Sequence, residues 1–214
     1  AHKAAADASD TSRFVLIDGD NIPDPEFFNL QLNLDSNNMD VVFRWKARNI
    51  INGLMYGNGG MSCWTKDFVY NMRTHEASDG SAENDVEFCF YPNYWAMNDC
   101  YSVTYPNATP FQAWRAGFRE GVKMSLDQGD KVSDLKSVWW QNYHRLLIWC
   151  NIGADVDNGL WSIYGAREGA YLTNCTDWDY SLVRDFEWLT DQWNEKYSTV
   201  TEEMIWYEIT GLGH

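Results

Sequence analysis

The sequence contains no apolar run long enough to span a membrane, and its N-terminus has no signal-peptide core. Basic residues are scarce, with 16 Lys and Arg against 31 Asp and Glu and a formal net charge of −15. Non-specific binding to nucleic acid needs clustered Lys and Arg, so this balance argues against a broad phosphate-binding face. We therefore expect a soluble protein.

Several catalytic motifs are missing as well. The sequence contains no G-x-S-x-G, P-loop, G-x-G-x-x-G or H-E-x-x-H motif, so nothing points to a hydrolase, kinase or dehydrogenase. Its five cysteines form no C-x-x-C pair, and an odd number cannot all pair within one chain. A reducing, cytoplasmic setting is the simpler account of these cysteines.

The most informative feature that is present is a short apolar run, residues 14–17, which ends in Asp18-Gly19-Asp20-Asn21. The run predicts a buried strand of an α/β sheet, and such sheets bind ligands at the carboxyl ends of their strands. Successive side chains of an extended chain point to opposite sides, so Asp18 and Asp20, which are two residues apart, point to the same side. Mg²⁺ and Mn²⁺ take carboxylate ligands and complete their shell with phosphates and water. The alternative is a surface turn rich in Asp, Gly and Asn.

The surroundings of this motif resemble one protein family. Residues 1–10 are typical of the end of an alanine-rich helix, and Thr11 to Arg13 connect it to the strand. The helix, the strand and the Asp-x-Asp ending are similar to the middle of the GT-A glycosyltransferases. Further segments resemble phage and bacterial glycosyltransferase sequences in the same order, and they are residues 42–60, 110–120, 148–155 and 185–189.

This resemblance implies an α/β fold with a GT-A-like mixed sheet flanked by helices, in a single domain over residues 1–214. It also implies that Asp18 and Asp20 hold Mn²⁺ or Mg²⁺ against the diphosphate of a nucleotide-sugar. A UDP-sugar is the expected donor, while the acceptor stays open between a glycan, a protein and a modified DNA base. GT-A domains carry a nucleotide-binding half before this motif, and only seventeen residues precede Asp18 here. We therefore expect a partial domain.

The remaining candidate residues fall in the other matching segments. Inverting glycosyl transfer needs a carboxylate base, for which Asp155 is the first candidate and Glu120 the second; either can instead be an ordinary cap or surface ion pair. Whether transfer inverts or retains stays open. His75 or His144 is a possible third metal ligand. The Gly/Asn-rich stretch at residues 52–60 predicts either a backbone cradle for a ligand or a hairpin turn. The residues expected to bind donor or acceptor are Arg48, Asn52, Gly59, Gly60, Trp64, Arg115 and Arg119.

Thr109-Pro110-Phe111-Gln112 predicts a helix start, because Thr caps, Pro suits the first turn and Gln completes a capping box. The apolar face of this helix is expected in the core and comprises Phe111, Trp114, Phe118 and Val122. A small-residue row comprises Ala113, Gly117 and Gly121. A basic stripe, either solvated or a grip on diphosphate or acceptor, comprises Arg115, Arg119 and Lys123.

The rest of the chain also gives local signals. Other helices are predicted at residues 66–72, 132–146, 159–172 and 180–196, the last burying Leu182, Phe186, Leu189 and Trp193. Extended segments are predicted at residues 27–34, 39–45, 61–64, 86–91 and 100–105. Residues 74–84 predict a mobile acidic loop.

A second function class stays open: a non-catalytic carbohydrate-binding or viral structural module, in the host cytoplasm if viral. Twelve tryptophans in 214 residues suit it, because aromatic faces hold sugar rings, although Trp also fills cores. In that case the Asp-x-Asp loop is only a turn or a calcium clip.

Overall fold

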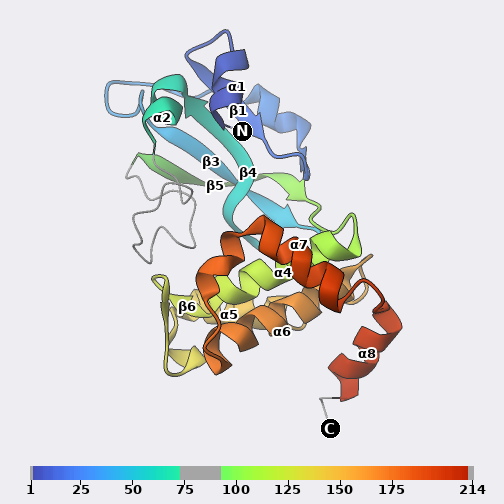
Figure 1. The fold of residues 1–214 in the computed structure, drawn as a ribbon. Coiled ribbons are helices and arrows are strands. Elements are labelled where there is room, and N and C mark those ends of the chain that lie inside the picture. The colour runs from blue at the N-terminus through green and yellow to red at the C-terminus, as the bar shows by residue number, and fades with distance from the viewer. Residues whose placement is uncertain (1, 73–92, 212–214) are drawn as a thin grey trace. The chain divides into compact units, whose positions relative to one another are not determined.

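The computed structural model describes residues 2–72 and 93–211, with residues 57–59 described as backbone. These residues form two compact units (Figure 1). The sheet unit comprises residues 2–72 and 93–105, and the helical unit comprises residues 106–211. The expected α/β protein with a mixed sheet is confirmed. A single domain over residues 1–214 stays a prediction.

The sheet unit is built on a mixed sheet, whose described strands lie in the order β1-β4-β3-β5-β2. β3 runs parallel to β5, while the other neighbouring pairs are antiparallel. Its elements are α1 (His2–Ala8), β1 (Arg13–Ile17), β2 (Asn21–Pro23), the 3₁₀ helix η1 (Pro25–Asn29), β3 (Val42–Asn49), β4 (Met55–Thr65), α2 (Lys66–Asn71) and β5 (Tyr94–Thr104).

The two faces of this sheet are covered by different elements. On one face, Val42 and Trp64 pack against α1 and against Phe68 and Val69 of α2. On the other, Phe27 of η1 packs edge-on against Trp45 at a ring separation of 4.8 Å, within a cluster that includes Phe43, Met61 and Cys63. Because successive strand residues point to opposite faces, Val42 and Phe43 can anchor one core each.

Several strand predictions need correction. β1 is an edge strand whose Val15 is 45% exposed, so the predicted burial of this strand is wrong. The β3–β4 hairpin turns at residues 50–54, and β4 already begins at Met55, so most of the Gly/Asn-rich stretch is strand. Residues 27–34 are not an extended strand, because η1 occupies their start. The predicted loop at 74–84 and strand at 86–91 lie outside the described residues.

The helical unit has a core formed by α4, α6, α7 and α8 around Trp114, Phe118 and Trp161. Its elements are α4 (Pro110–Met124), β6 (Leu126–Asp127), β7 (Asp130–Lys131), η3 (Leu135–Ser137), α5 (Trp140–Trp149), α6 (Gly159–Cys175), η4 (Tyr180–Arg184), α7 (Phe186–Lys196) and α8 (Glu202–Gly211). The predicted start of α4 is confirmed, since the Thr109 hydroxyl accepts a hydrogen bond from the Gln112 backbone N–H at 3.2 Å.

The helix predicted at residues 180–196 is interrupted. The Asp185 side chain accepts hydrogen bonds from the backbone N–H groups of Glu187 and Trp188, which starts α7 and separates it from η4. Leu189 is buried as expected, but Phe186 is 47% exposed and is not part of the buried stripe. α5 begins at Trp140 rather than at residue 132, and α8 was not predicted.

α4 and α6 are packed backbone to backbone through glycines on both helices. A Cβ atom on Gly117 would collide with the Ser162 carbonyl oxygen, and one on Gly169 would collide with the Phe118 carbonyl oxygen. Gly121 and Gly165 face carbonyl oxygens of the opposite helix in the same way. The predicted small-residue row is therefore the contact surface of α4.

A partly buried carboxylate lies beside this contact. Glu168 of α6 accepts hydrogen bonds from Trp114 Nε1 at 2.9 Å and from the Tyr197 hydroxyl at 2.6 Å. Burial, followed by the nearby Glu168 charge, raises the pKa of Tyr197 well above its usual value. Tyr197 therefore stays protonated and keeps donating a hydrogen bond to Glu168. Because Tyr197 directly follows α7, this bond links α7 to α6.

We predict that Gly169→Ala destabilises the protein by about 1 to 3 kcal/mol or more, because the new methyl group has no space against α4. Tyr171→Ala is the matched control in the same helix, since Tyr171 is 60% exposed; it should change the stability by only about 0.5 kcal/mol. Urea denaturation measures both values. A rise in the stability of Gly169→Ala, as expected for Gly→Ala in an open helix, would contradict the close packing.

Candidate functional site

Asp18 and Asp20 lie in the short turn between β1 and β2, and the backbone of this turn is held at three points. The Asp18 N–H donates to the Gly60 carbonyl at 2.8 Å, and the Asn21 N–H donates to the Asp18 carbonyl at 3.0 Å. The Tyr105 N–H donates to the Asp20 carbonyl at 2.7 Å. Segments that are distant in sequence, β4 and the end of β5, therefore fix the position of the turn.

The side chain of Asn21 is part of a hydrogen-bond network that reaches Asp20. Its Oδ1 accepts from the hydroxyls of Ser102 at 3.0 Å and Thr104 at 2.9 Å, both on β5. Its Nδ2 donates to Asp20 Oδ1 at 2.9 Å. Sequence reasoning missed Asn21, Ser102 and Thr104, and the only local signal was the spacing of two hydroxyl residues at i and i+2 on a predicted strand.

Gly60 leaves the space in which these polar side chains meet. Its φ of +73° is in the left-handed region that favours glycine. A Cβ atom on Gly60 would overlap Asn21 Nδ2 and would lie 2.9 Å from Asn21 Cγ and 3.1 Å from Asp18 Oδ2. The structure therefore brings together three predicted site residues, Asp18, Asp20 and Gly60, and it adds Asn21.

The two carboxylates influence each other electrostatically. Asp18 keeps contact with solvent on one side, while the turn and Gly60 crowd the other. Loss of water, followed by repulsion from the Asp20 charge, raises the pKa of Asp18 above its usual 3.8. A cation between or beside the two groups would relieve both effects.

The carboxylate oxygens of Asp18 and Asp20 suit a hard divalent cation whose coordination shell is completed by other ligands. Carboxylate oxygens are what Mg²⁺ and Mn²⁺ take, and Mg²⁺ sites with one or two carboxylates usually add water and substrate phosphates. Within residues 2–72 and 93–211, no third His, Cys, Asp or Glu joins the pair. His144 lies in the helical unit, where its Nδ1 is 2.7 Å from the Trp140 carbonyl oxygen, and His75 lies outside the described residues.

The other candidates of the sheet unit have different surroundings. Arg48 is exposed and alternates with Asn49 along β3, so it shares a sheet face with Val103 and not with Thr104. The Asn52 side chain accepts from the Leu54 N–H at 3.2 Å and closes the hairpin turn. Gly59 lies within β4.

Trp64 is 1% exposed in the core, so we remove it from the binding residues, because a buried ring offers no face to a ligand.

The remaining candidates belong to the helical unit. Asp155 is exposed in the turn before α6, and Glu120 lies 4.0 Å from Lys123 on α4. Arg115 and Arg119 each place the guanidinium 5.1 Å from the centre of the Phe186 ring. These two arginines therefore have a packing role through cation–π contacts, in addition to any role in binding.

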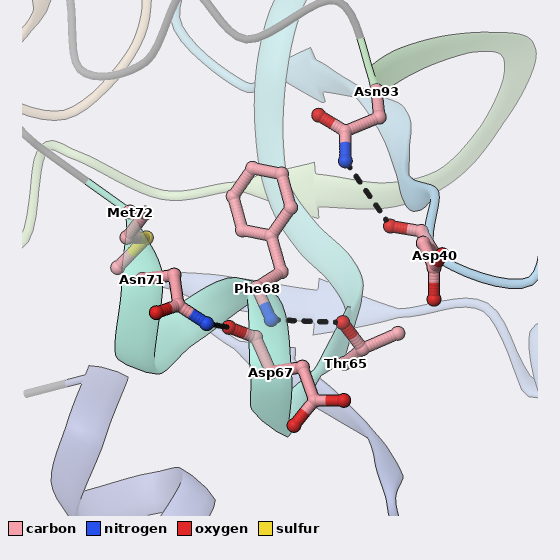
Figure 2. A pocket seen from close by; sticks show the side chains of 7 residues that line it. All are labelled: Asp40, Thr65, Asp67, Phe68, Asn71, Met72 and Asn93. Atoms are coloured by element: carbon pink, nitrogen blue, oxygen red, sulfur yellow. Dashed lines mark hydrogen bonds between the residues drawn. The ribbon is translucent and has the colours of Figure 1, made fainter.

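A pocket of about 240 Å³ lies elsewhere in the sheet unit (Figure 2). Its lining residues are Asp40, Thr65, Asp67, Phe68, Asn71, Met72 and Asn93.

Some of the polar groups that line this pocket form hydrogen bonds with one another. Asn93 Nδ2 donates to the Asp40 carbonyl at 3.4 Å, and Asn71 Nδ2 donates to the Asp67 carbonyl at 2.8 Å (Figure 2). None of the seven lining residues is basic, so this pocket is poorly suited to a diphosphate.

The pocket and the Asp turn lie at opposite ends of one strand pair. Thr65 of the pocket pairs with Arg13, the first residue of β1, whereas Asp18 follows Ile17, the last. At about 3.3 Å per residue, the extended segment from Arg13 to Asp18 separates them by about 17 Å. The pocket is therefore not an extension of the Asp18 and Asp20 site.

Comparisons with protein-family models, curated proteins and solved structures find no match for this chain. In the described parts of the chain, no helix has the length and apolar character needed to cross a membrane. The described cysteines, Cys63, Cys100, Cys150 and Cys175, are free thiols.

We predict that Gly60→Ala destabilises the protein, by about 1 to 2 kcal/mol for the left-handed backbone alone, with an added cost from displacing Asn21. Gly19→Ala is the matched control in the same turn, since nothing lies within 4 Å of a Cβ at Gly19. It should change the stability by only about 0.5 kcal/mol. Chemical denaturation of both variants without cations measures the difference, and equal losses would contradict the described geometry of Gly60.

We also predict a pH-dependent effect of Asp18→Asn. The pKa of Asp18 is raised in the folded state, so the folded protein binds this proton more tightly than the unfolded chain. The contribution of Asp18 to the free energy of unfolding therefore falls as pH rises from 3.8 through the folded pKa. In cation-free buffer, Asp18→Asn should melt above wild type at pH 7, and the gap should close as pH falls towards 3.8.

The control for this measurement is Asp10→Asn, which removes an exposed carboxylate of the same unit. Its melting temperature should follow that of wild type between pH 3.5 and 7. If Asp18→Asn melts below wild type at pH 7, the folded protein does not disfavour the charged form of Asp18, and the raised pKa is contradicted.

Proposed function

We propose that Asp18 and Asp20 hold Mn²⁺ or Mg²⁺, and that the chain is a metal-dependent glycosyltransferase, or part of one. The donor would be a nucleotide-sugar, with a UDP-sugar expected, and the acceptor a glycan, a protein or a modified DNA base. The observation that carries the proposal is the pair of carboxylates in a turn held by β4 and β5. Neither carboxylate forms an ion pair with a described residue, which leaves both available to a cation.

The bound cation would stabilise the negative charge that develops on the departing nucleoside diphosphate. The chain has a formal net charge of −15, so its own field repels a nucleotide-sugar. Neutralisation of the phosphates at Asp18 and Asp20 therefore fits an acidic protein that binds an anionic donor. In this proposal Asp18 and Asp20 hold the cation, and if the transfer is inverting, Asp155 or Glu120 is the expected base.

The GT-A arrangement belongs to this proposal too. The turn with Asp18 and Asp20 follows an edge strand that pairs antiparallel with β4. The general rule that ligands bind at the carboxyl ends of parallel strands therefore does not support a site at this turn. Support comes instead from the local geometry of Asp18, Asp20 and Gly60, and from the ordered resemblance of the sequence segments. A cytoplasmic location is part of the same proposal.

One observation favours the alternative of a carbohydrate-binding module. Trp139 and Trp140, neighbours at the start of α5, are 50% and 63% exposed, and exposed Trp rings hold sugars by stacking. Most other described tryptophans are in the cores, including Trp45, Trp64, Trp114, Trp149 and Trp161. Trp95 and Trp206 are also exposed, at 43% and 52%, but neither has a neighbouring tryptophan in the sequence, so the adjacent pair is the place proposed for sugar binding.

We predict that wild-type protein binds Mn²⁺ weakly alone and more tightly with UDP, because the diphosphate supplies further oxygen ligands. Asp20→Ala should lose this binding, since it removes one of two carboxylates. Asp67→Ala is the matched control, because it removes a carboxylate of the same unit at the opposite end of the β1–β4 pair. Calorimetric titration with Mn²⁺, with and without UDP, measures all three proteins.

Identical isotherms for wild type and Asp20→Ala would overturn the metal site. Oligosaccharide binding that is lost in Trp140→Ala and unchanged in Asp20→Ala would favour the carbohydrate-binding module instead.

A further inference from the structure

The geometry points to Asn21 as a positioning residue that orients Asp20 towards a divalent cation, and not as a third oxygen ligand. This inference rests on the proposed function, because it concerns the same cation. It goes further by assigning a role to Asn21 and to two β5 hydroxyls, Ser102 and Thr104, which lie 81 and 83 residues away in sequence.

The orientation of the Asn21 amide follows from the chemistry of its neighbours. An ionised carboxylate only accepts hydrogen bonds, so the amide atom 2.9 Å from Asp20 Oδ1 must be the donor Nδ2. The other amide atom is then Oδ1, and it faces the hydroxyls of Ser102 and Thr104, which can both donate. A flipped amide would place its oxygen against Asp20 and lose this hydrogen bond.

The same contacts exclude Asn21 Oδ1 from cation binding. An amide oxygen has two lone pairs, and two hydroxyl donors at 3.0 and 2.9 Å use them. A cation at this oxygen would need to displace at least one hydroxyl, and Ser102 is only 4% exposed. Asn21 therefore acts on the cation through Asp20.

The strand register makes this network stiff. Asn21 pairs with Thr104 and Pro23 pairs with Ser102, so the two hydroxyls are carried by the β5 residues directly across from β2. Gly60 supplies the space for the amide, because any side chain there would overlap it. Hydrogen bonds to a ligating carboxylate orient it, and losing them typically costs 10- to 100-fold in metal affinity.

The deciding variant is Asn21→Asp, because the two roles predict opposite signs. If Asn21 is a positioning residue, Asp at this position replaces the donor by an acceptor 2.9 Å from Asp20 Oδ1, and Mn²⁺ affinity should fall about 10- to 100-fold. If Asn21 were a ligand, a third carboxylate would tighten Mn²⁺ binding. Asn33→Asp, at an exposed position of the same unit, controls for the added charge.

A second pair of variants tests the network without changing the charge. Ser102→Ala and Thr104→Val each remove one hydroxyl donor to Asn21 Oδ1, and each should weaken Mn²⁺ binding in the same direction as Asn21→Asp but by less. Calorimetry or Mn²⁺ electron paramagnetic resonance measures the affinity, and circular dichroism checks folding. If Asn21→Asp does not fold, the combined Ser102→Ala/Thr104→Val protein decides, and unchanged affinity there overturns the inference.

The outcomes separate this inference from the proposed function. No Mn²⁺ binding by wild type, with or without UDP, overturns the proposed metal site and this inference with it. Binding by wild type together with equal or tighter binding by Asn21→Asp overturns only the positioning role. Weaker binding by Asn21→Asp, with Asn33→Asp like wild type, supports it.

Discussion

The candidate site depends on β3, although no residue of β3 belongs to the carboxylate turn. β3 pairs antiparallel with β4 on one side and parallel with β5 on the other, and it anchors both cores of the sheet unit through Val42 and Phe43. It thereby sets the spacing between β4, which carries Gly60, and β5, which carries Thr104. The turn with Asp18 and Asp20 is attached to both of these neighbours, so the position of the carboxylates follows from the pairing of β3.

Local signals in the sequence were sufficient where the structure depends on neighbouring residues. The capped start of α4 at Thr109 and the strand before Asp18 were predicted, and the β3–β4 hairpin was one of two alternatives, because each rests on contacts within a few residues. The bounds of the hairpin were less accurate, because Gly and Asn residues that suit a turn are used as strand in β4. Trp45 of β3 pairs with Met61 and Ala47 pairs with Tyr56, so the residues from Gly57 to Gly60 lie at an irregularity of the β3–β4 ladder, a place where glycine is common in strands.

The parts that were not predicted depend on contacts that are distant in sequence. A three-residue strand such as β2 has too few residues for a periodic pattern, and its partner β5 lies about eighty residues further on. The hydroxyls of Ser102 and Thr104 therefore gave no sign that they meet Asn21. Likewise, Trp64 looked like a possible sugar-binding ring, and only its packing against Phe68 and Tyr94 identifies it as a core residue.

The glycine contact between α4 and α6 bears on how this sequence can vary. At Gly117, Gly121, Gly165 and Gly169, even a methyl group meets the backbone of the opposite helix, which cannot move aside as a flexible side chain would. Substitution there cannot be offset by changing one neighbouring side chain, because the obstructing atoms are common to all residues. These positions should therefore be among the most invariant in any natural variants of the chain, whereas exposed positions of the same helices, such as Tyr171, are free to diverge.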